Sequence, residues 1–257
     1  MQNIEILKTI IEIKKNFPFK NYNDTTRDYI DIKQNSHFNI VSNILKVKNN
    51  DSTILDFGCG PLDKTAILKK LGYKCYAIDD HNDDWHLKDN NKAKIYEYAK
   101  SLDIHLYNSV QNLIQNNQNV KFDLIMLNDI IEHFHNSPRF LLNELDPLLQ
   151  KDGFYLITVP NSLNLKKRIK VLFGKTNYVE FRSFFLHEGN TFRGHVREYS
   201  KDCLSELCEI MNYEIIKLRG CNQMLHRIPN LFLPMWKIFT NIFPNMSDSY
   251  ILVAKKK

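Results

Sequence analysis

Apolar and polar residues alternate along this chain in two recurring patterns. Stretches with apolar residues three or four positions apart predict helices, and they separate short apolar runs that predict strands. This alternation favours parallel strands with helices on both faces of one sheet. The predicted strands of this part are TILDFG (53–58), KCYAID (74–79), IHLY (104–107), FDLIMLN (122–128) and GFYLITVPN (153–161). The helices between them are KTAILKKLG (64–72), AKIYEYAKSL (93–102), QNLIQ (111–115) and PRFLLNELDPLL (138–149).

The alternation is extended at both ends and interrupted once. Residues 1–48 form a predicted helical extension before the first strand, and residues 161–195 follow neither pattern. Since no repeat or low-complexity linker divides the chain, we expect a single domain of residues 1–257 with an insertion at 161–195. The predicted elements outside the central alternation are helices at 1–17, 35–47 and 200–212, and strands at 213–220 and 249–256.

An aromatic-rich segment, NLFLPMWKIFTNIF (230–243), precedes the last predicted strand and is broken by Pro234. An apolar segment of this kind is either part of the core beneath the last strand or an exposed face for a dimer or a membrane surface. Of the two we favour the core. The second alternative would allow a homodimer.

Basic side chains are concentrated in the insertion and just after it. The formal net charge of the chain is +6, and residues 161–199 hold eight basic and three acidic side chains. This surplus is either a solvated face or a site for an anionic partner. The basic residues are Lys166, Lys167, Arg168, Lys170, Lys175, Arg182, Arg193 and Arg197, and the acidic ones are Glu180, Glu188 and Glu198.

The remaining composition argues against export and membrane spanning. Residues 1–17 carry charges where an export signal would need an apolar centre, and no apolar run approaches the ~20 residues of a membrane span. The five cysteines form no Cys-x-x-Cys pair and several fall within apolar patterns, which predicts reduced core thiols. We therefore expect a cytoplasmic protein.

The loop after the first predicted strand indicates a nucleotide-like ligand. In ILDFGCGPLDKT (54–65), Gly58 and Gly60 let the backbone approach a ligand with no Cβ in the way. A dinucleotide-binding fingerprint would need a third glycine where Asp63 stands. The loop is therefore not a typical pyrophosphate site.

Acidic residues on either side of this loop narrow the ligand further. Asp56, directly before the loop, would repel a pyrophosphate but suits a ligand with a positively charged tail. Asp79, or alternatively Asp80, follows the second strand and can accept both hydroxyls of a ribose. An adenosine with a cationic tail and no phosphates meets these conditions, so the expected cofactor is S-adenosylmethionine.

Together these motifs resemble those of class I S-adenosylmethionine-dependent methyltransferases. ILDFGCG and YAIDD are similar to the family's first two motifs. FDLIMLNDIIEHF, LLQKDGFYLITVPNS and GHVREYSKDCLSELCEIMNYEII resemble the branch that includes ubiquinone-biosynthesis O-methyltransferases and surface-glycan methyltransferases. The resemblance covers residues 50–160 well and 194–219 moderately. It implies a Rossmann-like α/β fold with a seven-stranded, mostly parallel sheet whose last strand is antiparallel.

The resemblance also implies which residues hold the cofactor. In one respect the chain departs from the family, which often has a glycine where Leu62 follows Pro61. This departure predicts a stiffer loop near the methionine end of the cofactor. The implied cofactor-binding residues are Asp56, Phe57, Gly58, Cys59, Gly60, Asp79, Asp80, Asn108, Asn128 and Asp129.

Candidate catalytic residues follow the fourth strand and the insertion. His133, just past the strand tip, is the first candidate for a general base, although it could equally serve only to pack or cap. His195 and Arg197 in GHVREY form a second constellation that could face the acceptor. We predict no metal at this site, although DIIEH resembles a family pattern in which Asp129, Glu132 and His133 would be the ligands of a divalent cation.

The basic insertion suggests the chemistry of the acceptor. Segments after the fifth strand usually cover the acceptor pocket in this fold, so residues 161–195 would form a lid that favours a small anionic acceptor. The expected function is O-methylation of a nucleotide-linked sugar, a phosphorylated metabolite or a phosphate-like oxygen in surface polysaccharide biosynthesis. An RNA methyltransferase, although a nucleic-acid partner is not favoured, and an inactive cofactor-binding partner subunit are the alternatives.

Overall fold

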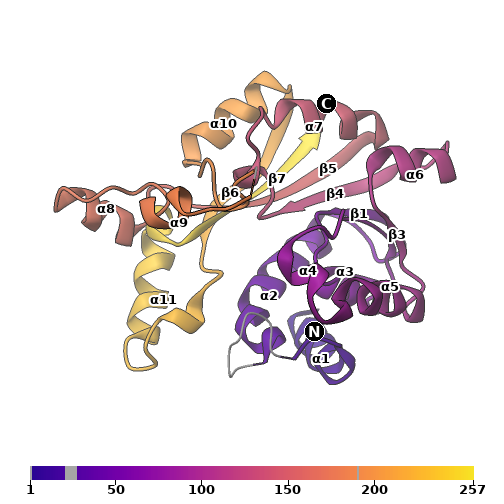
Figure 1. The fold of residues 1–257 in the computed structure, drawn as a ribbon, viewed down its shortest axis with the longest axis horizontal. Helices are drawn as coiled ribbons and strands as arrows, with labels where there is room; N and C mark the ends of the chain where they lie inside the picture. The colour runs from indigo at the N-terminus through magenta and orange to yellow at the C-terminus, as the bar shows by residue number, and fades with distance from the viewer. Residues whose placement is uncertain (1, 21–27, 190) are drawn as a thin grey trace.

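The computed structural model describes residues 2–20, 28–189 and 191–257. They build one seven-stranded sheet in the order β3-β2-β1-β4-β5-β7-β6, with helices packed around it (Figure 1). This arrangement confirms the predicted Rossmann-like α/β fold. The strands are β1 (Thr53–Phe57), β2 (Lys74–Ile78), β3 (His105–Tyr107), β4 (Phe122–Asn128), β5 (Leu149–Pro160), β6 (Tyr213–Cys221) and β7 (Ser249–Lys256).

The topology of the sheet creates a switch point between its central strands β1 and β4. Strands β1 to β5 are parallel, and β7 inserts between β5 and β6 and runs antiparallel to both. The chain moves outward from β1 to β3 and then returns to place β4 on the other side of β1. Ligands of open α/β sheets bind at such a switch point, beyond the carboxyl ends of the strands.

Helices cover both faces of this sheet, as expected. One buried cluster joins the sheet to α1, α2, α3 and α5, and the other joins it to α6, α7 and α10. The helices are α1 (Gln2–Asn16), α2 (Tyr29–Val47), α3 (Asp63–Lys70), α4 (Asp84–Leu87), α5 (Asn91–Ser101), α6 (Val110–Asn116), α7 (Arg139–Leu145), α8 (Leu165–Leu172), α9 (Phe181–Phe185), α10 (Lys201–Ile210) and α11 (Leu233–Ile242).

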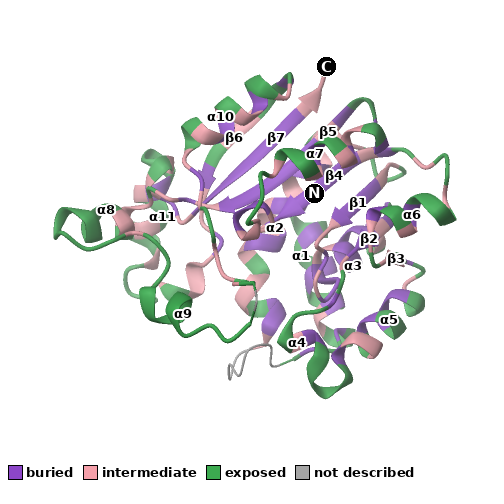
Figure 2. Ribbon diagram, turned by 45° about the horizontal axis from the view of Figure 1, so that its top comes forward, coloured by how far each residue is buried: buried purple, intermediate pink, exposed green. Residues whose placement is uncertain are grey.

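Alternation within the strands explains why the sheet has two cores. In β4, Leu124 and Met126 belong to the cluster on one face, whereas Ile125 and Leu127 belong to the cluster on the other. Successive side chains of a strand point to opposite faces, so a strand that is apolar throughout must be covered on both. Figure 2 shows this central part of the sheet as almost entirely buried.

The helical extension is fastened to the sheet domain through Asp63, the residue that breaks the dinucleotide fingerprint. Its carboxylate is fully buried and accepts a hydrogen bond from the Tyr29 hydroxyl at 3.1 Å. His37 Nε2 lies 2.7 Å and Lys64 Nζ 3.1 Å from it. Burial would raise the pKa of Asp63, but Lys64 and His37 outweigh burial and hold that pKa well below its usual range. Asp63 therefore joins α2 to the start of α3.

The aromatic segment at 230–243 is not core, and this expectation was wrong. Within α11 only Thr240 is buried, while Met235, Ile238 and Ile242 are exposed at helical spacing. A high aromatic content favours burial of a segment, but it does not show whether the segment is buried in the protein's own core or against another surface. Among the described residues, no helix combines the length and the apolar character needed to span a membrane.

Candidate active site

The glycine loop lies at the carboxyl end of β1, as its sequence predicts. Gly58 has φ +71°, and a Cβ there would lie 2.0 Å from Ile130 Cδ1. Gly60 has φ +53°, with open space where a Cβ would point. Leu62 follows with φ 67°, a left-handed conformation that is strained for a branched side chain, and is fully buried. Packing of Leu62 therefore fixes the end of the loop that the sequence marked as unusual.

Asp79 connects this loop to the end of β2. Its carboxylate accepts hydrogen bonds from the backbone N–H groups of Gly60 at 2.8 Å and His81 at 2.9 Å. Asp80 is exposed, and its carboxylate accepts a hydrogen bond from the N–H of Asn82 at 3.1 Å. Asp79 therefore holds the glycine loop and retains carboxylate lone pairs for a ligand.

A cavity of about 650 Å³ opens where β1, β2 and β4 end. Asn128, at the tip of β4, is 5% exposed, and both ends of its amide lack a hydrogen-bond partner in the described part of the chain. A buried amide with open donors and acceptors on a cavity wall fits a polar ligand. The predicted residues that line the cavity are Phe57, Gly58, Gly60, Asp79, Asp80, Asn108, Asn128, Asp129 and His133.

Two residues of the predicted cofactor set, Asp56 and Cys59, do not line this cavity. Asp56 is fully buried and accepts a 2.6 Å hydrogen bond from the Thr65 hydroxyl. Burial raises the pKa of Asp56 to about 6, although Lys64 and Thr65 oppose the shift. Burial also raises the pKa of the Cys59 thiol. Both residues are fully buried and absent from the lining of the cavity, so sequence proximity to the glycines did not place their side chains on its wall.

Asp129 holds a strained position directly after β4. Its φ is 56°, and its backbone N–H donates to the Thr158 carbonyl at 2.9 Å. The Thr158 hydroxyl donates to its carboxylate at 3.2 Å, and burial raises the pKa of that carboxyl. Left-handed backbone at a residue other than glycine costs energy and persists where neighbours fix it, which occurs often at functional sites.

His133 lines the same cavity and is oriented by the end of the insertion. Its Nδ1 lies 2.8 Å from the carbonyl oxygen of Arg193. A carbonyl only accepts, so Nδ1 carries the proton and the lone pair of the neutral ring is on Nε2. This tautomer gives His133 one nitrogen that can accept a proton.

Residues 191–193 form a strap across one side of the cavity, which all three line. Besides the contact to His133, the Phe192 carbonyl accepts from His135 Nε2 at 2.7 Å. The Arg193 guanidinium pairs with Asp83, which follows β2. Among the described residues of the predicted lid, only these three line the cavity, and none of α8 or α9 does.

His195 and Arg197 do not line the cofactor cavity. The His195 ring lies 5.0 Å from the His133 ring, and its Nδ1 donates to Glu198 at 3.1 Å. Burial, with smaller contributions from His133 and Lys167, lowers the pKa of His195 to about 4. Arg197 lines a separate hollow beside α10 and lies over the Tyr199 ring. His195 therefore contacts the ring of His133 without lining the cavity, whereas Arg197 faces the hollow beside α10.

A candidate metal set includes His195 instead of Asp129. The ligand atoms of Glu132, His133 and His195 lie within 4.8 Å of one another, and within the described ranges Asp129 does not join them. The Glu132 carboxylate is fully buried, and both its oxygens lack a hydrogen-bond partner in that part of the chain. Burial, with Asp129 nearby, raises the pKa of Glu132 to about 9. Nitrogen and carboxylate ligands of this kind fit a divalent transition metal.

A family model described as a methyltransferase domain matches residues 32–218. The chain belongs to this methyltransferase family. Its cofactor is S-adenosylmethionine, which the open cavity, the glycine loop and the buried Asn128 amide all fit. The cofactor is therefore the one predicted from the glycine loop with Asp56 before it and Asp79 after it.

Individual proteins similar to the methyltransferase agree with this assignment. Ubiquinone biosynthesis O-methyltransferase of Rickettsia typhi is 29% identical over 236 residues, 90% of this chain and 80% of the relative. Two solved structures share the fold. A cyclopropane-fatty-acyl-phospholipid synthase-like protein from Lactobacillus casei is 11% identical with a TM-score of 0.61, and the match covers 97% of this chain and 99% of the Lactobacillus chain. Magnesium protoporphyrin IX methyltransferase from Synechocystis, with bound SAH, has a TM-score of 0.53 at 12% identity, covering 98% and 100%.

Two histidines near the cofactor cavity were missed by sequence reasoning. His81 is fully buried with φ 49°, and its Nε2 lies 3.2 Å from the Gly60 carbonyl. His86 lines the cavity, and neither of its ring nitrogens has a hydrogen-bond partner among the described residues. Their position in the acidic stretch DDHNDDWH, directly after β2, was the available signal.

Exchange of Asp79 should separate the two candidate ribose acids. We expect Asp79→Asn to weaken SAH binding by about 10- to 100-fold, because an amide loses a charge-assisted acceptor and sets N–H groups against those of Gly60 and His81. The matched Asp80→Asn variant should bind SAH nearly as the wild type does. Titration calorimetry measures both. Equal losses in the two variants would contradict this assignment.

Proposed function

We propose that this methyltransferase transfers the methyl group of S-adenosylmethionine to an oxygen of a small anionic acceptor, with His133 as general base. The observation that carries the proposal is the position of His133 on the wall of the cofactor cavity, with its proton held on Nδ1 by the strap. A base must lie beside the reacting group with its lone pair free.

The reaction balances with this single base. A lone pair of the acceptor oxygen forms a bond to the methyl carbon while the bond from carbon to the sulfonium sulfur breaks, and the sulfur keeps the electron pair. The acceptor hydroxyl proton moves to His133 Nε2 and later to solvent. The sulfonium is already a good leaving group, so the protein mainly aligns the acceptor and accepts the proton.

Residues of the cavity wall divide the work of holding the cofactor. The Asp79 carboxylate would accept ribose hydroxyls, and the Asn128 amide offers both a donor and an acceptor. Asn108 and Asp80 lie further along the same wall. A divalent cation held by Glu132, His133 and His195 would polarise the acceptor oxygen, but it would occupy the His133 Nε2 lone pair, so metal assistance is an alternative to the general base and not an addition to it.

Cationic and polar groups near the strap support an anionic acceptor. Arg193 lines the cofactor cavity and pairs with Asp83. Arg182 and His187 line a neighbouring hollow of about 750 Å³ between α9 and α4, whose lining also includes Asp84, Glu180 and Glu188. Guanidinium groups bind phosphates and carboxylates well. A nucleotide-linked sugar of surface polysaccharide biosynthesis is the acceptor that we propose first. The name of the Rickettsia relative adds ubiquinone precursors as a second class to test.

An acceptor screen tests this function. Purified protein and S-adenosylmethionine are incubated with nucleotide-linked sugars, phosphorylated metabolites, phenolic ubiquinone precursors and RNA, and SAH formation is followed by mass spectrometry. We expect an anionic small molecule to gain one methyl group on oxygen, with Arg193→Ala raising KM. Turnover confined to RNA, or to uncharged acceptors, would contradict the proposal.

A further inference from the structure

The insertion forms two helices whose apolar side chains have no cover. Neither α8 nor α9 contains a buried residue. On α8, Ile169 and Leu172 are exposed and Phe173 follows directly after the helix, with Leu172 81% exposed. On α9, Phe181 and Phe185 stack with a ring distance of 5.3 Å and both remain exposed. Large apolar side chains gathered on the surface mark an interaction site.

Helix α11 adds to this exposed surface. Figures 1 and 2 place α8, α9 and α11 at the same end of the molecule, away from the α1–α5 side of the sheet. Met235, Ile238 and Ile242 form one exposed stripe of α11, and Leu231 and Phe232 before the helix are also exposed. We name the exposed faces of these three helices the apolar end.

Basic residues surround the apolar end. Residues 161–189 hold six basic and two acidic side chains, and residues 225–246 hold two basic side chains and no acidic one. On α8, Lys166 and Lys170 lie one turn apart and flank the row of Leu165, Ile169 and Leu172. A short helix whose apolar row is flanked by lysines is typical of segments that lie in the interface of an anionic membrane, because lysine stems run along the apolar surface while their ammonium groups reach the headgroups. Lys167 is half-buried and pairs with Glu198. The other basic residues of these segments are Lys166, Arg168, Lys170, Lys175, Arg182, Arg227 and Lys237.

We propose that the apolar end docks on the surface of an anionic phospholipid membrane, with α8, α9 and α11 in the headgroup region. The positive charge around the apolar end favours an anionic membrane over a second copy of the chain as the binding partner. A two-fold dimer through this end would place the same basic residues of both copies against each other, whereas anionic lipids neutralise them.

Docking at this end would bring the membrane close to the substrate side of the enzyme. Helix α9 lines the hollow of about 750 Å³ together with Asp84 of α4, and Asp83 next to it lines the cofactor cavity. The strap, directly after α9 in the chain, also lines the cofactor cavity. The docked enzyme would thus face an acceptor that carries a lipid or lies at the membrane surface.

Vesicle co-sedimentation of the full chain tests this inference. We expect the wild type to bind vesicles of equal parts phosphatidylglycerol and phosphatidylcholine, and to bind pure phosphatidylcholine far less. Leu172→Glu with Phe185→Glu should weaken binding by about tenfold or more, since it places charge in the apolar face. Lys166→Glu with Lys170→Glu should do the same and reduce the salt dependence. Neither pair contacts the core, so melting temperatures should stay unchanged.

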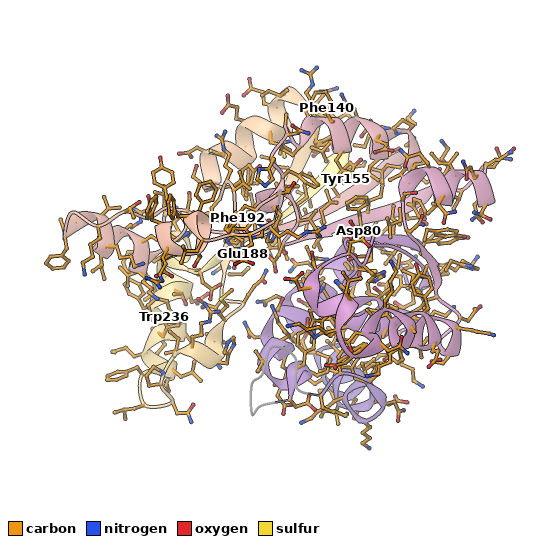
Figure 3. All side chains as sticks on the ribbon, viewed as in Figure 1. Asp80, Phe140, Tyr155, Glu188, Phe192 and Trp236 are labelled. Atoms are coloured by element: carbon orange, nitrogen blue, oxygen red, sulfur yellow. The ribbon has the colours of Figure 1, made fainter. Side chains whose placement is uncertain are left out.

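Phe140→Glu provides the matched control. Phe140 is 73% exposed on α7, at a different end of the molecule from Trp236 of α11 (Figure 3), so this variant should bind vesicles as the wild type does. Failure of the wild type to bind phosphatidylglycerol vesicles, or an equal loss in Phe140→Glu, would overturn the proposal. A wild-type dimer in light scattering that the Leu172/Phe185 variant breaks would assign the apolar end to a second copy and overturn it as well.

Discussion

Replacement of His133 by alanine is expected to lower kcat by about 10²- to 10⁴-fold, the usual contribution of a positioned general base. The variant should still bind SAH, because the glycine loop, Asp79 and Asn128 are untouched. Single-turnover assays with saturating S-adenosylmethionine, together with calorimetry of SAH binding, separate the chemical step from cofactor affinity.

His135→Ala is a close control for this experiment. His135 donates to the Phe192 carbonyl as His133 does to the Arg193 carbonyl, so each variant loses one hydrogen bond to the strap. His135 does not line the cofactor cavity. A small effect of His135→Ala beside a large effect of His133→Ala would assign the loss to proton transfer. Near-normal turnover in both His133→Ala and His195→Ala would refute the general-base role.

Asp63→Ala is expected to destabilise the protein by about 3–5 kcal/mol, as found when one partner of a buried ion pair is removed. The change would leave Lys64 as a buried charge and His37 without its carboxylate partner. Thermal and urea unfolding at pH 7 measure the loss. We also expect α1 and α2 to exchange amide hydrogens faster, because Asp63 joins the extension to α3.

The pH dependence of this contribution has a defined sign. The folded-state pKa of Asp63 lies below its ordinary value of 3.8. Its stabilising contribution is therefore present above that ordinary value and is lost as the pH falls through the folded-state pKa. Asp103→Asn is the control, since Asp103 pairs with Lys69 while 85% exposed, and asparagine tolerates its left-handed backbone at φ 53°. It should leave the free energy of unfolding almost unchanged, and a loss as large as that of Asp63→Ala would contradict the assignment.

Local patterns carried most of the information about the fold. Strands β1 to β5 and the helices between them follow from hydrophobic periodicity, because each element is a short continuous segment with its own apolar pattern. Helix α2 begins at Tyr29, earlier than the predicted residue 35, since Asp28 caps it with a 2.9 Å hydrogen bond to the N–H of Ile30. Polar residues at its start hid this from the apolar pattern.

The sequence by itself determined the cofactor and the strand that presents it. Gly58 and Gly60 have positive φ angles that favour glycine, and Asp79 is the residue directly after β2. These three positions can therefore be recognised from a short stretch of sequence. Tertiary structure alone decided which side chains line the cavity. It buried Asp56 and Cys59 away from the lining, brought the carbonyl of Arg193 to His133 across 60 residues of sequence, and left α11 exposed. Each of these outcomes depends on contacts between distant segments, which periodicity and spacing do not encode.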